Sequence, residues 1–414
     1  MPTTRRSTPA VHKSGTLCQA CKAYETIALV LQGGGALGAY QAGVYEGLHE
    51  AGVELSYLAG ISIGALNVAI LAGNPPERRI ERLREFWSTI CQPYGGLPSN
   101  PMLEASLFQI NDLARQFIGG LNAGSALLLG QKGFFRPRFP PAAFMPLAEP
   151  ACVGYYDTRP LKDTLERLCD FDRINDGGVH VSVGAVNVRS GNFAYFDNRR
   201  TRLRPEHFMA SGALPPAFPA VEIDGEYYWD GGLVSNTPLT EVLTEHPERD
   251  TLVFQVDLWS ARGAVPRSIR DVDDRVQDIR YSSRTRAITE QMRAYRKMQR
   301  ALRDVLNQVP AEIRERDPSC RVAETLAGHK RYNIIHLIYR NKSYEQHHRD
   351  YQFGLTTMRE HWESGLQDIR NTLAHEEYLA MPDNIAGFVT HDVHRDEIER
   401  TMRGEREAGG DERP

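Results

Sequence analysis

The sequence predicts an α/β fold built on a parallel sheet, and two glycine-rich turns are the basis of this prediction. The first turn, Gly33–Gly38, follows the short apolar run Ile27–Leu31, and the second, Gly60–Gly64, follows the apolar run Tyr57–Ala59. Each turn opens into a helix-compatible stretch, which is typical of a strand, a turn and a helix in succession. Because such units place their turns at one edge of a parallel sheet, we expect the two turns to lie close together.

The second turn has the pattern of a nucleophile elbow. In Gly60-Ile61-Ser62-Ile63-Gly64, glycines stand two positions on either side of a serine, which permits a sharp, strained bend that lifts the hydroxyl above the sheet. The first turn supplies backbone N–H groups at a helix start, where they lack intrahelical partners and lie at the positive end of the helix dipole. Such groups suit a developing oxyanion, so the two turns together indicate a serine hydrolase.

The first turn also satisfies a different pattern, the dinucleotide-binding fingerprint. Gly33, Gly35 and Gly38 have the G-x-G-x-x-G spacing, and Glu54 lies near the distance expected of a ribose-binding acid. In a nucleotide-binding unit, however, the acid ends the second strand. Glu54 precedes the second apolar run, and Ser62 follows it. The order of these residues therefore favours the hydrolase over the nucleotide-binding protein.

A serine nucleophile needs a base, and Asp230 is the leading candidate. It follows three aromatic residues, Tyr227, Tyr228 and Trp229, that are typical of a buried strand, and it precedes two glycines that let backbone pass close to its carboxylate. The ordinary pKa of an aspartate, near 3.9, makes it a weak base at neutral pH, so burial has to raise that pKa. Asp-Gly-Gly is equally typical of a hairpin turn.

Asp257 is the rival base. It lies at the end of the apolar run Leu252–Leu258, a position where catalytic acids of α/β hydrolases are found. Histidines follow it in the chain, so a Ser-Asp-His order is also available. The histidines concerned are His329, His336, His347 and His348.

Four blocks of this chain, in this order, resemble the patatin-like phospholipases. They are the glycine loop at 33–38, the elbow at 60–64, the segment Ala210–Pro219 and the Asp-Gly-Gly at 230–232. The resemblance covers roughly residues 25–260. It implies a three-layer α/β/α fold and hydrolysis of lipid acyl esters, of the phospholipase A or lysophospholipase kind, by a Ser-Asp dyad without a catalytic histidine. It implies no metal and no organic cofactor.

The resemblance also assigns roles to individual residues. It implies that Ser62 is the nucleophile and Asp230 its base, and that the N–H groups of Gly34 and Gly35 bind the oxyanion. Many members carry Arg or Lys at the fifth position of the glycine loop, where this chain has Leu37. That departure bears on phospholipid preference more than on hydrolysis. The glycines implied in the site are Gly33, Gly34, Gly35 and Gly38 of the oxyanion loop, Gly60 and Gly64 of the elbow, and Gly231 and Gly232 beside the base.

We expect four regions along the chain. Residues 1–23 are a disordered tail, 24–265 the hydrolase domain, 266–399 a mostly helical extension and 400–414 a frayed charged tail. The extension resembles one found in a bacterial subgroup of the family. Within it, the patterns predict a long charged helix over 267–306, a strand over 330–339 and a helix over 354–373.

Composition excludes several classes of protein. A formal net charge of −4 gives no general attraction to nucleic acid or anionic membranes, and no stretch approaches the roughly twenty apolar residues of a membrane span. Six scattered cysteines match reduced thiols, and the single C-x-x-C, Cys18 with Cys21, has no second pair to complete a zinc site. We expect a cytoplasmic protein that binds a lipid or acyl-ester substrate, alternatively at the periphery of a membrane.

Any contact with a lipid surface must therefore be local. Phe134–Phe139 combines three phenylalanines with two arginines, a composition that suits an interface of headgroups, although a loop packed on its own domain has the same composition. Two other functions remain open at this point. One is hydrolysis of another acyl ester, such as a storage polyester or a thioester, and the other is a catalytically silent lipid-binding scaffold.

Overall fold

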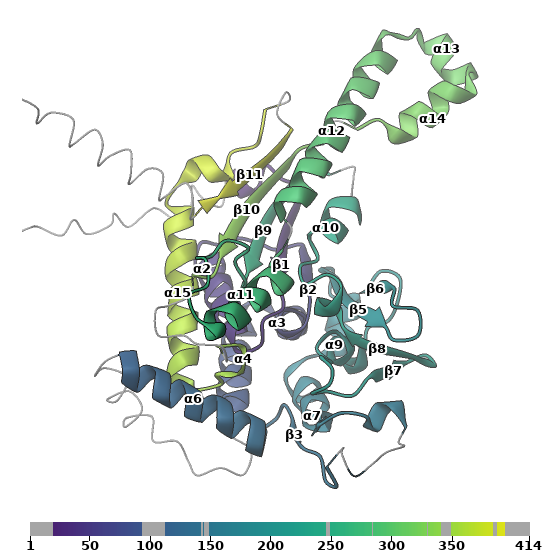
Figure 1. Ribbon diagram of the computed structural model, residues 1–414. Coiled ribbons are helices and arrows are strands. Elements are labelled where there is room, and N and C mark those ends of the chain that lie inside the picture. The colour runs from purple at the N-terminus through teal and green to yellow at the C-terminus, as the bar shows by residue number, and fades with distance from the viewer. Residues whose placement is uncertain are drawn as a thin grey trace, which may run out of the picture.

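A nine-stranded mixed sheet forms the centre of the described part of the chain (Figure 1). The computed structural model describes residues 20–92, 112–141, 144, 149–245, 249–283, 285–328, 330–340, 349–383 and 387–393. The strands follow the order β11-β10-β9-β1-β2-β5-β8-β7, and β6 also pairs with β5. Their bounds are β1 Thr26–Leu31, β2 Tyr57–Gly60, β5 His180–Asn187, β6 Phe193–Asp197, β7 Val221–Ile223, β8 Glu226–Asp230, β9 Thr251–Asp257, β10 Tyr332–Ile338 and β11 Phe388–Asp392.

The two glycine-rich turns leave the sheet side by side, as the sequence predicts. Strand β1 pairs in parallel with β2, and Leu31 lies opposite Gly60, so both strands end at the same level. The parallel pairing continues from β1 through β9 and β10 to β11, and from β2 to β5. Only β6, β7 and β8 run antiparallel to their neighbours. The prediction of a parallel sheet is thus confirmed for its centre, and the strand that carries Asp230 belongs to the antiparallel part.

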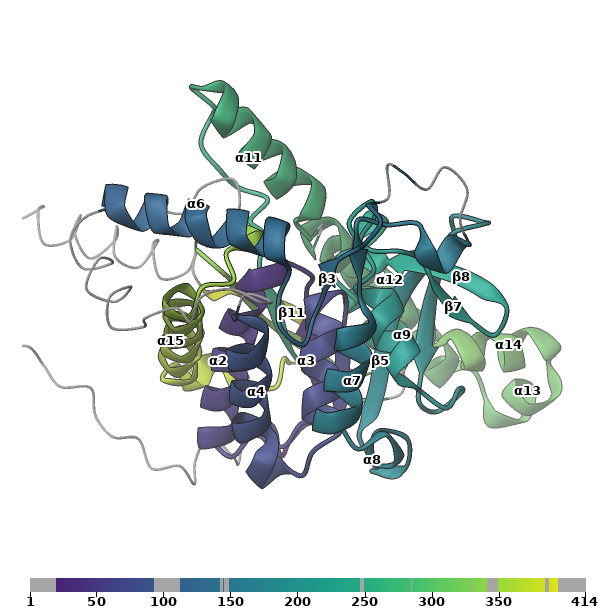
Figure 2. The ribbon, with the colours of Figure 1, turned by 90° about the horizontal axis from the view of Figure 1, so that it is seen from below.

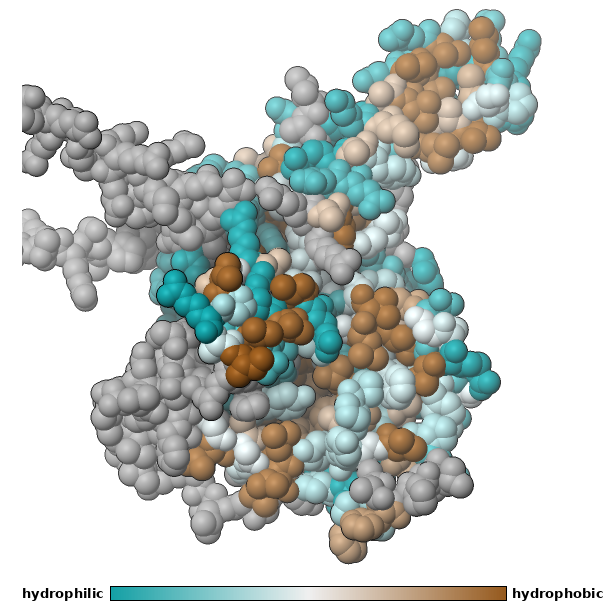
Figure 3. Space-filling view, in the orientation of Figure 1, coloured by the Kyte–Doolittle hydropathy of each residue, from teal (hydrophilic) through white to brown (hydrophobic). Residues whose placement is uncertain are grey.

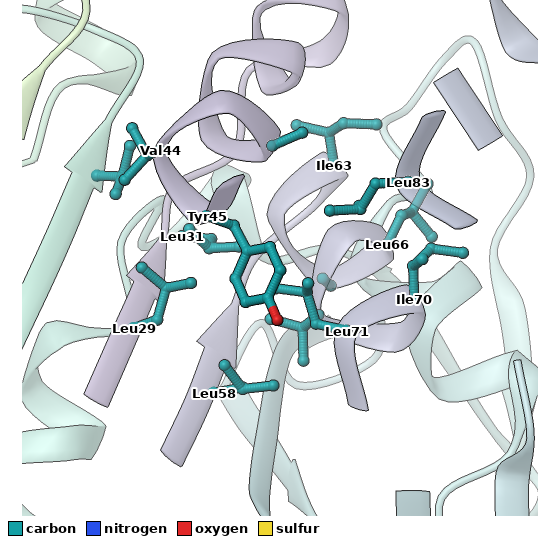
Figure 4. Packing of buried hydrophobic residues seen from close by; sticks show 14 of the residues in the cluster. Leu29, Leu31, Val44, Tyr45, Leu58, Ile63, Leu66, Ile70, Leu71 and Leu83 are labelled. Carbon is teal, nitrogen blue, oxygen red and sulfur yellow. The ribbon is translucent and has the colours of Figure 1, made fainter. Parts of the chain in front are cut away.

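Both faces of β1 are buried, as expected of a strand in the middle of an α/β sheet. Ile27, Leu29 and Leu31 face one apolar cluster, and Ala28 and Val30 face a second. Figure 4 shows the first cluster, in which side chains of β1 and β2 meet those of α2, α3 and α4. Helices α10 and α12 cover the second. The covering helices are α2 Ala39–Glu50, α3 Ile63–Ala72, α4 Pro76–Ile90 and α15 Leu355–Leu373 on one face, and α10 Leu239–Glu245 and α12 Thr285–Gln308 on the other.

This arrangement confirms the predicted three-layer α/β/α architecture. Helix α4 illustrates how the pattern determines the packing: Leu83, Phe86, Trp87 and Ile90 recur at helical spacing, and all four are fully buried on a helix that packs against α2 and α3. The remaining helices surround the antiparallel strands and the carboxyl ends of the parallel ones. They are α6 Asp112–Leu129, α7 Arg159–Leu168, α8 Phe171–Asp176, α9 Pro205–Ser211 and α11 Ile269–Tyr281, and a short ribbon of β3 Arg136–Pro137 and β4 Tyr156–Asp157 lies beside them.

The C-terminal part of the chain completes the sheet. Strand β10 pairs with β9, which confirms the predicted strand, and α15 confirms the predicted helix over 354–373. Helix α15 packs directly on α2 (Figure 2). A Cβ at Gly43 of α2 would collide with the backbone of Trp362, and a Cβ at Gly365 of α15 would collide with that of Tyr40. These two glycines let the helix backbones approach closely.

The single long helix predicted over 267–306 is wrong, because the structure divides this stretch. Helix α11 ends at Tyr281 and α12 begins at Thr285. Ser282, which ends α11, has extended backbone angles. Beyond the sheet, α12 continues into an arm with α13 Ala311–Arg316 and α14 Pro318–Leu326, which projects from the body of the molecule (Figure 1).

Candidate active site

Ser62 occupies a strained turn between β2 and α3. Its backbone has φ 55° and ψ −126°, in the region that a non-glycine residue rarely adopts. The flanking glycines explain how the chain reaches this geometry. A Cβ at Gly60 would collide with the backbone of Gly64, and a Cβ at Gly64 would collide with that of Leu31. The turn therefore has the form of a nucleophile elbow.

Both the backbone and the side chain of Ser62 are held by hydrogen bonds. Its N–H donates to the Ser211 hydroxyl at 3.0 Å, and that hydroxyl donates to the Gly184 carbonyl at 2.7 Å. Ser211 is fully buried and belongs to the segment Ala210–Pro219. The Ser62 side chain is hydrogen-bonded to Asp230.

Asp230 ends β8 and is 2% exposed. Its Oδ1 accepts the Gly232 N–H at 2.7 Å, and a Cβ at Gly231 would press on the Gly184 backbone. Both glycines after Asp230 are thus needed where the chain turns. Burial raises the pKa of Asp230 to about 7, against the opposing effect of the hydrogen bonds from Ser62 and Gly232. A carboxylate in this state accepts a proton at neutral pH far more readily than an exposed one.

The backbone amides of the glycine loop differ in their hydrogen bonding. The 3₁₀ helix η1, Gly35–Gly38, follows Gly34 directly, and Gly35 has φ 55°. The N–H groups of Gly34 and Gly35 have no hydrogen-bond acceptor among the described residues. The Gly33 N–H already donates to the Asn236 carbonyl at 3.2 Å, and Gly38 lies against Ile63.

Three side chains that the sequence analysis did not single out hold this loop. Gln32 accepts the N–H groups of Leu258 and Trp259 with its Oε1, at 2.6 and 2.9 Å. Asn236 Nδ2 donates to the Gly33 carbonyl at 3.0 Å, and Trp259 Nε1 donates to the same carbonyl at 2.9 Å. Asn236 is the one with a local signal, since it lies six positions after Asp230 in the same turn-rich segment.

A cavity brings these groups together. It encloses about 730 Å³ of empty space, part of it open to solvent. Ser62, Asp230 and the first three glycines of the loop line it together with a largely apolar wall, so an apolar chain can lie beside the serine hydroxyl. The apolar wall comprises Ile63, Leu66, Phe134, Phe135, Leu214, Ala217, Phe218, Trp259 and Phe353.

The segment Phe134–Phe139 takes a different place from the one predicted. Phe134 and Phe135 are buried, line the cavity and pack against Phe218. The Arg136 guanidinium pairs with Asp157 at 3.0 Å, and of the three phenylalanines only Phe139 is exposed, at 92%. The prediction that this segment as a whole docks on lipid is therefore wrong, because its first two aromatic rings are part of the core.

Comparison with known families bears on this geometry. A family model described as patatin-like phospholipase matches residues 29–243, more than half of the chain, and a second, described as patatin phospholipase, matches residues 279–385. The chain belongs to the patatin-like phospholipase family. This membership makes it a lipid ester hydrolase, with an extension beyond the hydrolase region that the second model covers.

The chain is also similar to solved structures, at low sequence identity. The chain is similar to VipD from Legionella pneumophila, with 16% identity over 91% of this chain and 73% of that one, at a TM-score of 0.31. It is also similar to human GIVD cytosolic phospholipase A2, with 13% identity over 58% of this chain and 45% of that one, also at 0.31. No curated protein matches the sequence.

In this patatin-like chain the fifth residue of the glycine loop has an apolar role. Leu37 is fully buried in the main core cluster beside α2. It therefore contributes packing at a position where many members carry a basic residue.

The rival base lies in another cavity. Asp257 accepts His336 Nε2 at 2.6 Å and the Ser283 hydroxyl, and these three residues line a second cavity in which Ser62 takes no part. The Asp257–His336 pair exists, but the structure does not bring it to Ser62. The other three histidines considered for a triad, His329, His347 and His348, lie outside the described residues.

Proposed function

We propose that this protein hydrolyses the carboxylic ester bond of lipids, in the manner of a phospholipase A or lysophospholipase, with Ser62 as nucleophile and Asp230 as base. The observation that carries the proposal is the buried Asp230 carboxyl group, hydrogen-bonded to a serine on a strained elbow. The apolar wall of the cavity supports an acyl chain as the part of the substrate that lies beside the serine.

The reaction proceeds in two stages on this geometry. Ser62 Oγ attacks the ester carbonyl while Asp230 takes its proton, and the N–H groups of Gly34 and Gly35 bind the resulting oxyanion. Asp230 then gives the proton to the leaving alcohol, and the acyl group remains on Ser62. Water, deprotonated by Asp230, attacks the acyl carbonyl, and the fatty acid leaves as Asp230 returns this proton to Ser62 Oγ. The reaction needs no group beyond the side chains and amides named here.

A fluorophosphonate probe tests this assignment, because it labels a serine only when the hydroxyl is activated. We expect one labelled peptide, containing Ser62, and no label in Ser62→Ala. Labelling of a different serine, or none in the folded wild type, would overturn the proposal. The second result would favour the catalytically silent scaffold.

We further propose that the protein meets its substrate at a lipid surface through two helices beside the cavity. Tyr281, the last residue of α11, lines the cavity, and α6 packs against the 3₁₀ helix η5, Arg349–Tyr351, which also lines it. Both helices expose apolar side chains, and Figure 3 shows those gathered over α11. They are Ile269, Val272, Val276 and Ile279 of α11 and Leu121, Leu127, Leu128 and Leu129 of α6.

The projecting arm supplies a matched control for this surface. Ile313 and Val322 of the arm are also more than half exposed, and Figures 1 and 2 place α13 and α14 away from α6 and α11. Ile269→Ser with Ile279→Ser should lower binding to, and hydrolysis of, phosphatidylcholine vesicles, while Ile313→Ser with Val322→Ser should not. Hydrolysis of a short soluble ester should be unchanged in both. Equal vesicle binding by the two variants would overturn this proposal.

No helix among the described residues is long and apolar enough to cross a bilayer. Contact through α6 and α11, as proposed, would be peripheral.

A further inference from the structure

A second acidic side chain, Asp350, faces the cavity that holds Ser62 and Asp230. It belongs to η5, and its backbone carbonyl lies so close to Gly35 that a Cβ there would collide with it. Asp350 therefore sits next to the glycine loop. Its Oδ1 is buried and has no hydrogen-bond partner among the described residues. A buried carboxyl oxygen without a partner is costly unless a ligand satisfies it.

The charged side chains that line the cavity are all acidic among the described residues. Among the described residues that line it, Asp230 and Asp350 are acidic and none is Lys, Arg or His. Two arginines lie next to this lining, and both have partners: Arg349 donates to Asp278 and stacks on Trp259, 4.6 Å from the ring centre, and Arg280 is hydrogen-bonded to Tyr281. Nothing in this lining would balance a phosphate.

The other titratable groups near Asp350 and its neighbour Tyr351 come from the same 3₁₀ helix, from α11, and from β4 and β8, which carry Tyr156 and Asp230. Tyr351 follows Asp350, and Tyr281 and Asp274 belong to α11. Helix η1 and the part of α6 whose side chains are described carry none. The electrostatic field at Asp350 is therefore set mainly by burial, Arg349 and acidic neighbours.

We propose that Asp350 binds the alcohol part of the substrate and selects lipid esters whose alcohol part is an uncharged polyol, such as monoacylglycerols, over those that carry a phosphate near the ester. A carboxyl group accepts a hydrogen bond from a hydroxyl, or donates one to it when protonated. A phosphate in the same place is repelled by a carboxylate and meets no cation among the described residues that line the cavity. The proposal rests on the proposed roles of Ser62 and Asp230.

The protonation of Asp350 makes this selection depend on pH. Burial raises its pKa to about 7, with Arg349 lowering it and Asp274 raising it. The carboxyl is therefore mostly neutral at pH 6 and mostly charged at pH 8. Repulsion of a phosphate should be weaker at the lower pH.

The test compares two substrates with the same acyl chain, 1-monoacylglycerol and lysophosphatidylglycerol, each at low mole fraction in neutral detergent micelles. The phosphodiester keeps one negative charge from pH 6 to pH 8, so its own titration does not interfere. The ratio of the two kcat/KM values cancels the ionisation of Asp230, which both substrates need. We expect the ratio to favour the monoacylglycerol and to rise about tenfold from pH 6 to pH 8.

Two variants distinguish Asp350 from charge elsewhere. In Asp350→Asn, an isosteric neutral amide, the ratio should no longer change with pH, and Asp350→Ser should behave likewise. Asp273→Asn removes an exposed carboxylate from α11 and should behave as the wild type. Since the wild-type ratio needs no variant, the test survives poor folding of either one.

Each outcome decides one way. A wild-type ratio that favours lysophosphatidylglycerol, or that does not change with pH, overturns the role of Asp350. So does an Asp350→Asn ratio that still rises with pH. Failure of the proposed function looks different, because Ser62→Ala would then retain hydrolysis of both substrates and of a short soluble ester.

Discussion

Two buried aspartates end strands of the same sheet, and their surroundings differ sharply. Asp230, at the end of β8, accepts hydrogen bonds from the Ser62 hydroxyl and from the Gly232 N–H. Asp257, at the end of β9, accepts two contacts from Gln255 Nε2 at 3.0 Å, a third from His336, a fourth from Ser283 and a fifth from the Thr237 hydroxyl at 3.5 Å. One carboxyl group is poor in donors and the other is saturated with them.

The difference explains why one of the two suits a base. Burial raises the pKa of Asp230, and the two hydrogen bonds that it accepts offset this rise only in part. Burial opposes the charge of His336, yet the Asp257 carboxylate raises the pKa of that imidazole above its usual value. The pair Asp257–His336 is therefore best described as an internal ion pair that holds β9 to β10.

The largest expected effect is a difference in activity between the alanine variants of two serines, Ser62 and Ser283. Ser62→Ala should lower ester hydrolysis by at least about a thousandfold, because it removes the attacking atom. Ser283→Ala, which removes the hydroxyl bonded to Asp257, should leave most of the activity. Initial rates on a short soluble ester, with circular dichroism to check folding, measure both. Residual activity above about a hundredth in Ser62→Ala would move the nucleophile elsewhere.

Asparagine substitutions at the two aspartates should also differ in their effect on activity. Asp230→Asn keeps the shape of the side chain but cannot take the proton of Ser62, so its activity should fall nearly as far as that of Ser62→Ala. Asp257→Asn should remain active at temperatures where it is folded. Single-turnover kinetics on a chromogenic ester compare the acylation rates directly. If Asp257→Asn or His336→Ala were folded and as inactive as Ser62→Ala, the Ser-Asp-His alternative would be right.

The sequence predicts one of these sites better than the other, for a physical reason. The elbow and the Asp-Gly-Gly turn require particular backbone geometries, and only glycines at fixed spacing permit them. A short stretch of sequence is therefore enough to recognise these turns. Ser62, Asp230 and the glycine loop could therefore be singled out from short patterns. The role of Asp257 depends on His336 and Ser283, which come from other elements, and no local pattern joins them.

The same limit applies to the residues that hold the loop. Gln32 contacts Leu258 and Trp259, more than two hundred positions away, and Asp350 reaches the cavity from the C-terminal part of the chain. In the fold, too, local patterns can be predicted and contacts between distant parts of the chain cannot. The continuous apolar run of β1 predicts its burial, whereas the position of β10 beside β9 is decided by long-range pairing that the sequence does not display.

A smaller effect concerns stability at the second site. Asp257→Asn leaves His336 without its carboxylate in a buried place, and we expect the free energy of unfolding to fall by about 3 kcal/mol at pH 7. Urea unfolding measures this change. The control is Asp273→Asn, whose carboxylate is exposed on α11 and whose loss should shift the free energy by no more than about 0.5 kcal/mol. A loss as small in Asp257→Asn would show that the ion pair contributes nothing net.

The last prediction concerns how the titration of Asp230 makes the free energy of unfolding depend on pH. Its pKa is raised on folding from the ordinary value of 3.8 to about 7, so the native state holds a proton that the unfolded chain has released. The stability that this proton confers is complete below the unfolded pKa and is lost as pH rises through the folded one. The side chain of Asp230→Asn does not titrate, so the variant shows no such loss of stability. Relative to wild type, this variant should therefore gain about 3 kcal/mol in free energy of unfolding between pH 5 and pH 8.5. Because both proteins carry Asp350, the titration of that group cancels in the difference. A difference that stays constant with pH would mean that Asp230 is no more basic than an exposed aspartate, and the contrast between the two carboxyl groups would disappear.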